Sequence, residues 1–452
     1  MTTTLHAGSA TSNITPPLGT AIPGGFRPQY AQDIDDELFA KALVIDNGET
    51  RIAMVTCDLI AVTQKIVDCT KARIAARCDI PPEHVMVNAT HTHSGVAVAN
   101  LLGVDEDTDY TDWVPLKIAD AVELAVLRRR PARIGFASVN EDRISFHRRW
   151  HMKDGTVRMN PGVANPDLIA PTGPIDPELA MMYVEGEDGS PISAVANFSL
   201  HYVGTDSGRA ISADYFGHFF RLMRRYLGDE CVPLLWNAAS GEINNIDFSG
   251  RTKWTARGHQ QAKKMANVLA GHMITELQFM EMHESLELAG AVGTLEFPRK
   301  TITPEDLQTA EKVLAAPVGT YDKYETGPFS WVVGQPIPKD RVDIYALECQ
   351  RLAKLPEKMA APVQVLRLGE AAIVALPGEV FVETGLNIKS QSSMNPLFVV
   401  SLANGYIGYI CTDIALKEHG GYETWAGMSS LGGVGTAPAM EKLVFSLLRQ
   451  VG

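Results

Sequence analysis

The sequence predicts an α/β or α+β fold in which helices flank a layered, mixed β-sheet core. Three observations lead to this prediction. Apolar runs with strand character alternate with longer segments of helical periodicity through most of the chain. Two pairs of strand-like runs are joined by short turn signals, so a purely parallel repeat is not expected. No linker-like stretch divides the 452 residues, and we expect a single large domain over residues 1–452.

The first part of the chain alternates between the two element types. Short apolar runs typical of strands occupy residues 51–58, 84–90 and 132–139. Helical periodicity covers residues 63–78 and 112–130. The second of these segments ends in basic side chains, which the negative end of a helix dipole favours.

The rest of the chain predicts two hairpins and one long helix. Residues 179–184 and 192–200 flank a Gly-Glu-Asp-Gly-Ser-Pro turn, and residues 363–368 and 371–376 flank a Gly-Glu turn. The other expected elements are strands at 232–236 and 397–402 and a helix at 252–277. Two irregular segments rich in Pro and Gly, residues 145–176 and 315–339, are expected to form loops that wall a site.

Composition narrows the class of protein. Hydrophobic residues make up 45% of the chain and charged residues 21%, which excludes a mainly disordered chain. The net charge of −13 argues against nucleic acid or an anionic membrane as the main partner. No apolar run has the length of a membrane span, and the N-terminus shows no signal peptide, so a cytoplasmic location is expected. The six scattered cysteines predict neither a zinc finger nor a disulfide framework.

Three strand ends deliver side chains that bind metals. The run Asn-Ala-Thr-His91-Thr-His93-Ser-Gly follows one strand, and Asn-Phe-Ser-Leu-His201 ends another. In an extended segment His91 and His93 face the same side, where they can serve as two ligands or as a ligand and a proton shuttle. Glu379 follows Pro-Gly at a third strand exit. Each has a simpler alternative, a capping histidine or a carboxylate in a helix first turn. Together they fit a catalytic zinc site with an open position.

Other motifs, taken alone, are weaker evidence for a functional site. Leu-Ala-Asn-Gly-Tyr406-Ile-Gly-Tyr409 and Tyr422-Glu423 carry tyrosines whose alternative role is packing with the hydroxyl at a rim. The turn that contains Asn244 is also explained by ordinary turn chemistry. No nucleotide-binding glycine motif and no Gly-x-Ser-x-Gly elbow is present.

These motifs, in this order, resemble the neutral/alkaline non-lysosomal ceramidase family, specifically its N-terminal catalytic domain. The resemblance covers nearly the whole chain. Its most specific pieces are Ala-Thr-His-Thr-His-Ser-Gly, Asn-Phe-Ser-Leu-His, Ser-Ala-Asp-Tyr-Phe-Gly, Pro-Gly-Glu and Ala-Asn-Gly-Tyr-Ile-Gly-Tyr. The resemblance implies a zinc-dependent hydrolase of amide bonds that uses metal-activated water, with one Zn²⁺ per chain.

The resemblance also assigns residues. It implies four zinc ligands, which are His91, His201, Glu379 and Tyr409. It places His93 beside the attacking water, and matches Arg143 and Tyr422 to substrate-contacting positions. We expect His93 to protonate the leaving nitrogen and Arg143 or Tyr422 to stabilise the developing oxyanion. Asp58 and Asp214 either orient the ligand histidines or serve as ordinary strand-end and helix-cap carboxylates.

The chain departs from the family pattern in two ways that bear on the substrate. Asn244 stands where ceramidases carry a serine near the metal, and we expect the protein to lack the C-terminal β-sandwich domain of the family. The basic run at residues 143–153, which includes Arg148 and Arg149, is suited to binding carboxylates, although a solvated basic face is the alternative. The sequence therefore predicts an amidohydrolase of a small, polar or anionic substrate, such as a carboxylated amide. The alternatives are a lactone or ester hydrolase with the same site, and a non-catalytic ligand-binding homologue. No oligomeric state is predicted.

Overall fold

The computed structural model describes residues 4–252, 257–317 and 328–452 and has the mixed α/β architecture that the sequence predicts. A nine-stranded sheet has the order β16-β14-β13-β8-β1-β5-β6-β7, with β18 paired to β8. Most neighbours are antiparallel, whereas β6–β7 and β14–β16 are parallel. The strands are β1 His6–Asn13, β5 Phe39–Asp46, β6 Arg51–Cys57, β7 Val85–Ala89, β8 Arg130–Asn140, β13 Glu178–Gly186, β14 Pro191–Phe198, β16 Leu234–Asn237 and β18 Met282–His283.

A second, four-stranded sheet has the order β19-β20-β21-β23. Its strands are β19 Leu288–Pro298, β20 Lys358–Leu368, β21 Ala371–Ala375 and β23 Leu397–Val400. Strands β20 and β21 form the expected hairpin around Gly369, which has a φ of 66°. The predicted hairpin of β13 and β14 is present as well.

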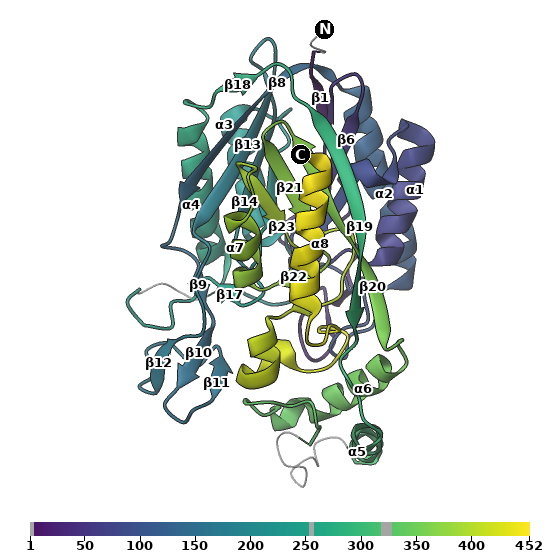
Figure 1. Cartoon of the computed structure of the whole chain (residues 1–452), viewed down its shortest axis with the longest axis vertical. Helices are drawn as coiled ribbons and strands as arrows, with labels where there is room; N and C mark the ends of the chain where they lie inside the picture. The colour runs from purple at the N-terminus through teal and green to yellow at the C-terminus, as the bar shows by residue number, and fades with distance from the viewer. Residues whose placement is uncertain (1–3, 253–256, 318–327) are drawn as a thin grey trace.

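Of the eight α-helices of the described residues, α5 and α6 lie at the lower end of the molecule in Figure 1, beyond the sheets, and the others flank the two sheets. They are α1 Gln64–Cys78, α2 Thr108–Leu127, α3 Asp214–Leu227, α4 His259–Glu276, α5 Pro304–Ala315, α6 Val342–Ala353, α7 Val382–Ser390 and α8 Thr436–Val451. No helix in the described part of the chain is long and apolar enough to cross a membrane.

Alternation along the strands builds four layers. In β5, Ala42 and Val44 face the core beneath α1 and α2, whereas Leu43 and Ile45 face the opposite core, which the second sheet also fills. The far face of the second sheet packs against α8 through residues such as Val444. The order is therefore helix, sheet, sheet, helix, with edge strand β19 of the second sheet partly exposed.

The large sheet curls so that its two ends approach each other. Trp236 of β16 donates a hydrogen bond from its indole Nε1 to Thr56 Oγ1 of β6, at 2.9 Å. The carboxyl ends of β7 and β14, which are far apart in strand order, are thereby brought to one place. This curl positions the candidate site.

Several predicted boundaries were wrong. Helix α2 begins at Thr108 because Asp107 caps it, accepting from Tyr110 N at 3.0 Å, and it ends at Leu127 because Arg130 already belongs to β8. Helix α4 begins at His259; residues 253–256 lie outside the described residues.

The first irregular segment is not simply a loop. It forms a small sheet of β10 Arg149–Met152, β11 Val157–Met159 and β12 Leu168–Pro171. Of the second irregular segment, residues 318–327 lie outside the described residues.

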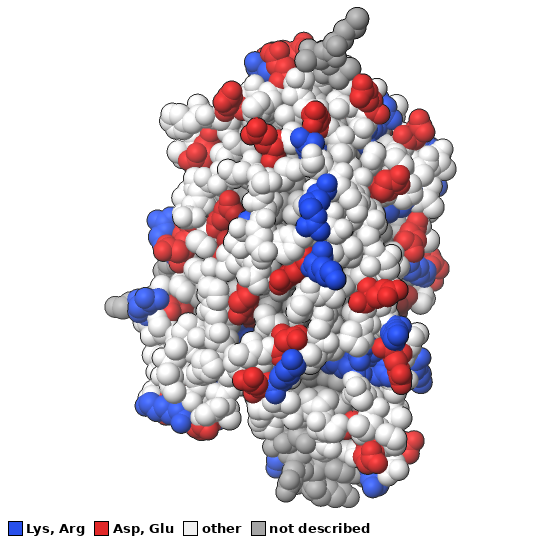
Figure 2. All heavy atoms as spheres, in the orientation of Figure 1, with Lys and Arg blue, Asp and Glu red and all other residues white. Residues whose placement is uncertain are grey.

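Short paired segments complete the fold. They are β2 Ala21–Ile22, β3 Gln29–Tyr30, β4 Asp33–Ile34, β9 Phe146–His147, β15 Ala210–Ile211, β17 Ile243–Asn244, β22 Glu379–Val380 and β24 Tyr409–Ile410. Short non-α helices cover Pro82–His84, Lys339–Arg341, Ala415–His419 and Tyr422–Thr424. The face shown in Figure 2 carries acidic and basic side chains interspersed, without a large patch of one sign. All six cysteines are free thiols.

Candidate metal centre

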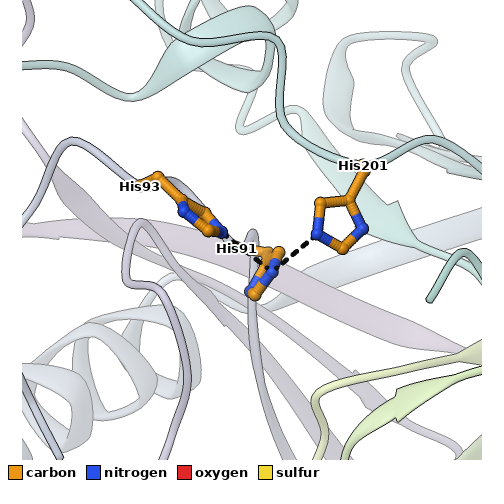
Figure 3. A group of neighbouring side chains, drawn as sticks. All are labelled: His91, His93 and His201. Atoms are coloured by element: carbon orange, nitrogen blue, oxygen red, sulfur yellow. Dashed lines mark hydrogen bonds between the residues drawn. The ribbon is translucent and has the colours of Figure 1, made fainter. Parts of the chain in front are cut away.

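Three histidines from two strand ends converge at one point (Figure 3). His91 and His93 follow β7, and His201 follows β14. His91 Nε2 lies 3.2 Å from His201 Nε2 and 3.1 Å from His93 Nε2. Glu379, the first residue of β22, places its Oε2 3.4 Å from His91 Nε2 and 3.6 Å from His201 Nε2. The three strand exits singled out in the sequence therefore do meet.

The backbone at His91 is not extended, contrary to the sequence-based expectation. Its φ is 72°, in the left-handed region that non-glycine residues rarely adopt. Two backbone hydrogen bonds hold the turn, from Thr90 N to Cys57 O and from His91 N to Leu59 O, both at 2.9 Å. Backbone strain of this kind costs on the order of 1–3 kcal/mol and occurs preferentially at functional sites. The two imidazoles meet because the chain turns here.

Backbone carbonyls fix the orientation of His91 and His201. His91 Nδ1 lies 2.6 Å from the carbonyl of Ile60, and His201 Nδ1 lies 3.1 Å from that of Ser240. A carbonyl only accepts, so each Nδ1 carries the proton and each Nε2 presents a lone pair. Oxygens that hold ligand histidines in this way are typical of metal sites.

The lone pairs face one another and a third acceptor. Glu379 Oε2 is buried and has no hydrogen-bond partner within the described residues. Three acceptor atoms at these separations repel one another unless a cation lies between them. A single proton added to one of them can form a hydrogen bond to only one of the other two at a time. The edge of a zinc tetrahedron with bonds of 2.0–2.2 Å is about 3.3–3.6 Å. The separations of 3.2, 3.4 and 3.6 Å between His91, His201 and Glu379 therefore fit a zinc-sized ion.

Two tyrosines complete the surroundings of Glu379. Tyr406 donates to Glu379 Oε1 at 2.8 Å, and the hydroxyl of Tyr409 accepts from Arg148 Nη2 at 3.1 Å. Burial alone raises the pKa of Glu379, but His91 and the two tyrosines lower it below its usual range. Tyr406 is thus committed to orienting the carboxylate, which leaves Tyr409 as the tyrosine of this motif suited to the fourth ligand position.

Both His201 and His93 are neutral at physiological pH. Burial lowers their pKa values well below the usual range, and the nearby charge of Arg148 lowers them further. Neutral imidazole is the form that binds metal ions.

His93 is held on both sides. Its ring stacks on Tyr202 with a centroid distance of 3.6 Å and an interplanar angle of 15°. A Cβ at Gly24 would collide with His93 Nδ1, so only glycine fits there. A pocket of about 160 Å³ opens beside this ring, and Arg257 lies on its wall. Sequence reasoning missed Tyr202 and Gly24, although both adjoin recognisable features, the His201 motif and a Pro-Gly-Gly turn.

The arginine that reaches the site is Arg148, not Arg143. Arg143 pairs with Glu141, and its side chain is 68% exposed. Arg148 is buried, with Nε 2.8 Å from Glu423 Oε1 and Nη2 on Tyr409. Arg149 is committed to Glu423 and to the carbonyl of Gly420. The basic run is therefore split between the surface and a buried ion-pair group, and it is not a continuous anion-binding face.

The remaining candidates have structural partners. Asn244 donates to Asn160 Oδ1 at 3.0 Å and accepts from Ile246 N. Asp58 pairs with Lys41 at 2.7 Å, and Asp214 accepts from the backbone of the loop after His201. Neither aspartate contacts His91 or His201, because backbone carbonyls occupy the position next to each Nδ1. Tyr422 is half-buried and packs edge-on against Tyr409, at 5.7 Å between centroids.

Comparison with known proteins tests the resemblance and the fold. No protein-family model matches the chain. A curated relative, the neutral ceramidase of Pseudomonas aeruginosa, is 24% identical over 90% of this chain and 65% of its own length. The chain is similar to the neutral ceramidases. It therefore spans about two thirds of the length of that curated ceramidase.

Two solved ceramidase structures confirm the fold. The crystal structure of neutral ceramidase from Pseudomonas aeruginosa superposes with a TM-score of 0.72 at 18% identity, over 98% of this chain and 74% of the ceramidase. A ceramidase complexed with C2 gives a TM-score of 0.73 at 17% identity, over 98% and 75% of the two chains. The resemblance that the motifs indicated is confirmed.

Proposed function

We propose that this protein is a zinc-dependent hydrolase that cleaves the amide bond of a small, polar or anionic N-acyl substrate. The observation that carries the proposal is the convergence of two imidazole lone pairs and a carboxylate oxygen at the edge lengths of a zinc tetrahedron. The similarity to an enzyme named neutral ceramidase supports amide hydrolysis as the reaction.

His91, His201, Glu379 and Tyr409 would hold the ion. A bound zinc ion supplies water activation at neutral pH and polarises the substrate carbonyl. The neutral His93, fixed by Tyr202, takes a proton from the attacking water at Nε2 and returns it to the leaving nitrogen.

Arg148 holds the hydroxyl of Tyr409 in place through Nη2, and Glu423 in turn fixes Arg148. Arg148 is thus a positioning residue for Tyr409. The hydroxyl of Tyr422 remains our candidate for stabilising the oxyanion, since this tyrosine packs on Tyr409 beside the site.

The pocket next to His93 supports a small substrate. Its volume of about 160 Å³ is below the roughly 300–1,000 Å³ of pockets that enclose drug-sized ligands. Its wall carries Arg257, whose charge is close enough to lower the pKa of His93. A carboxylate on the substrate would meet a cation there, which replaces the earlier expectation that the run at residues 143–153 binds it.

The test compares matched substrates with zinc-loaded full-length protein. An N-acyl amino acid, its uncharged amide, a lactone and a long-chain ceramide are assayed for the wild type and for Arg257→Ala, with Arg158→Ala, an exposed arginine paired with Asp154, as the control variant. We expect the N-acyl amino acid to have the lowest KM, and Arg257→Ala to remove that preference.

Turnover of ceramide above all carboxylated amides would contradict the proposed substrate class. Turnover of the lactone alone would replace amide cleavage with ester-type hydrolysis. Ligand binding without turnover of any substrate would indicate a non-catalytic homologue.

A further inference from the structure

A second group of metal-binding side chains lies in the segments around the candidate centre. His147 comes from β9, Glu242 from the turn before β17, and Glu383 from the first turn of α7. One ligand atom of each lies within 4.8 Å of the others. His147 is 4% exposed and Glu242 is fully buried.

Each of these side chains carries a buried polar atom without a hydrogen-bond partner. His147 Nε2, Glu242 Oε2 and Glu383 Oε2 are buried and have no hydrogen-bond partner within the described residues. A buried polar atom without a partner costs about 1–3 kcal/mol, so three in one place need a physical reason.

The opposite ends of two of these groups are fixed by the backbone. Glu242 Oε1 accepts from Val382 N at 2.7 Å, and His147 Nδ1 lies 3.1 Å from the carbonyl oxygen and 3.2 Å from the backbone nitrogen of Arg149. These contacts hold the Glu242 and His147 side chains in place, with Glu242 Oε1 4.0 Å from His147 Nε2.

Gly173 borders the group and leaves it room. A Cβ at this position would collide with Glu383 Oε1 and would lie 3.0 Å from His147 Nε2. Its φ is not in the left-handed region, so backbone conformation does not require a glycine. The space next to the free atoms is what the missing side chain preserves.

The charge of the group favours a divalent cation. The carboxylates of Glu242 and Glu383 lie close enough to repel each other when both are ionised. Arg149 is the nearby cation, but it already pairs with Glu423. A metal ion neutralises both carboxylates. One imidazole and two carboxylates suit a transition metal such as Zn²⁺ or Mn²⁺ better than Ca²⁺.

We propose that His147, Glu242 and Glu383 form a second site for a divalent transition-metal ion, separate from the centre at His91 and His201. The ion joins β9, the turn before β17 and the start of α7. These are the segments that carry Arg148, next to His147, and Glu379, four residues before Glu383. The role is structural: it fixes the wall of the active site. The proposal goes beyond the proposed function and does not depend on it.

The experiment measures metal content of the full chain, stripped with a chelator, reloaded with Zn²⁺ or Mn²⁺ alone and freed of excess ion. We expect two ions in the wild type and one in each of Glu383→Gln, Glu242→Gln and Gly173→Ala. His201→Ala should keep the second ion, so the two sites are read separately. The matched control is Glu287→Gln, a glutamate whose side chain is 78% exposed.

A second readout guards against misfolding. Reloading should raise the melting temperature of the His201→Ala protein, and this rise should vanish when Glu383→Gln is added. Unchanged metal content in Glu383→Gln and Gly173→Ala, with melting curves like the wild type, would overturn the second site and leave a proton shared by the two carboxyls as its occupant.

Discussion

Two histidine–carboxylate groups lie in neighbouring segments of this protein and differ in how their neighbours set the charge. At the first, His91 and two tyrosines hold the pKa of Glu379 below its usual range. At the second, burial and Glu383 hold the pKa of Glu242 above its usual range. The same kind of side chain, buried in both places, thus has its ionised form favoured in one group and disfavoured in the other. A cation next to Glu242 would work against that shift, because it stabilises the ionised carboxylate.

A third histidine–carboxylate pair, Glu141 and His272, can be compared with both candidate sites and is called the reference pair. Glu141 contacts His272 at 2.9 Å and is also bonded to Arg143 through several atoms. Neither oxygen of Glu141 lacks a partner. This pair contains the same chemical groups but needs no ion, which shows that unpartnered atoms, and not residue type, mark the two candidate sites.

The largest effect is expected from breaking the first group. His201→Ala removes one of the three converging atoms that would coordinate the metal. We therefore expect loss of the ion bound there and loss of measurable hydrolysis, while the fold survives. Elemental analysis with circular dichroism tests this expectation. A wild-type metal content in His201→Ala would show that the ion is held elsewhere.

Removal of His93 should separate proton transfer from metal binding. His93→Ala should retain the metal and lose about 10²–10⁴-fold in kcat, the usual contribution of a general acid or base. The loss should be smaller for substrates whose leaving group needs no proton. Single-turnover kinetics on substrates with good and poor leaving groups measure the rate loss. Equal losses on both kinds of substrate would exclude His93 as the proton donor to the leaving group.

A smaller effect tests how Glu379 is held. Tyr406→Phe deletes the hydrogen bond to Glu379 Oε1 and should weaken metal affinity about 10–100-fold, as removal of groups that orient metal ligands generally does. Competition with a chromophoric chelator measures the affinity. Tyr345→Phe, a buried tyrosine outside the group, is the matched control. Unchanged affinity in Tyr406→Phe would mean that Tyr409 orients Glu379 alone.

The smallest effect concerns the reference pair and depends on pH. Burial would raise the pKa of Glu141, but Arg143 and His272 together lower it to about 2, from a usual value near 4.5. A lowered pKa means that the ionised pair stabilises the fold above pH 4.5 and that this contribution is lost as the pH falls toward 2.

Thermal melting of the wild type and of Glu141→Gln should therefore differ at pH 7 and converge between pH 4.5 and 2. Metal should not alter the difference, since this pair binds none. A constant difference down to pH 2 would contradict the lowered pKa.

The sequence allowed the layered mixed fold and the convergence of His91, His201 and Glu379 to be predicted, because strand periodicity is local and each of these residues ends a strand-like run. Which arginine enters the site could not be predicted. Arg143 lies in the connection between β8 and β9, whereas Arg148 follows β9 directly. The direction of the chain here depends on the pairing of β9 with β17, which is a contact between distant segments.

The second group was beyond sequence reasoning for a similar reason. Its members are separated by 95 and 141 positions, and no local motif links His147, Glu242 and Glu383. The left-handed turn at His91 was also missed, because nothing in Thr-His-Thr-His favours a positive φ; backbone hydrogen bonds from a neighbouring strand exit impose it.

The clamp on His93 has a consequence for the timing of each catalytic cycle. Tyr202 covers one face of the ring, and the backbone at Gly24 lies against its Nδ1 edge. An imidazole confined in this way has fewer orientations open to it than an exposed side chain, which changes rotamer in picoseconds to nanoseconds. If His93 carries the proton as proposed, much of its orientation would be set when the chain folds and would not be repeated for each substrate.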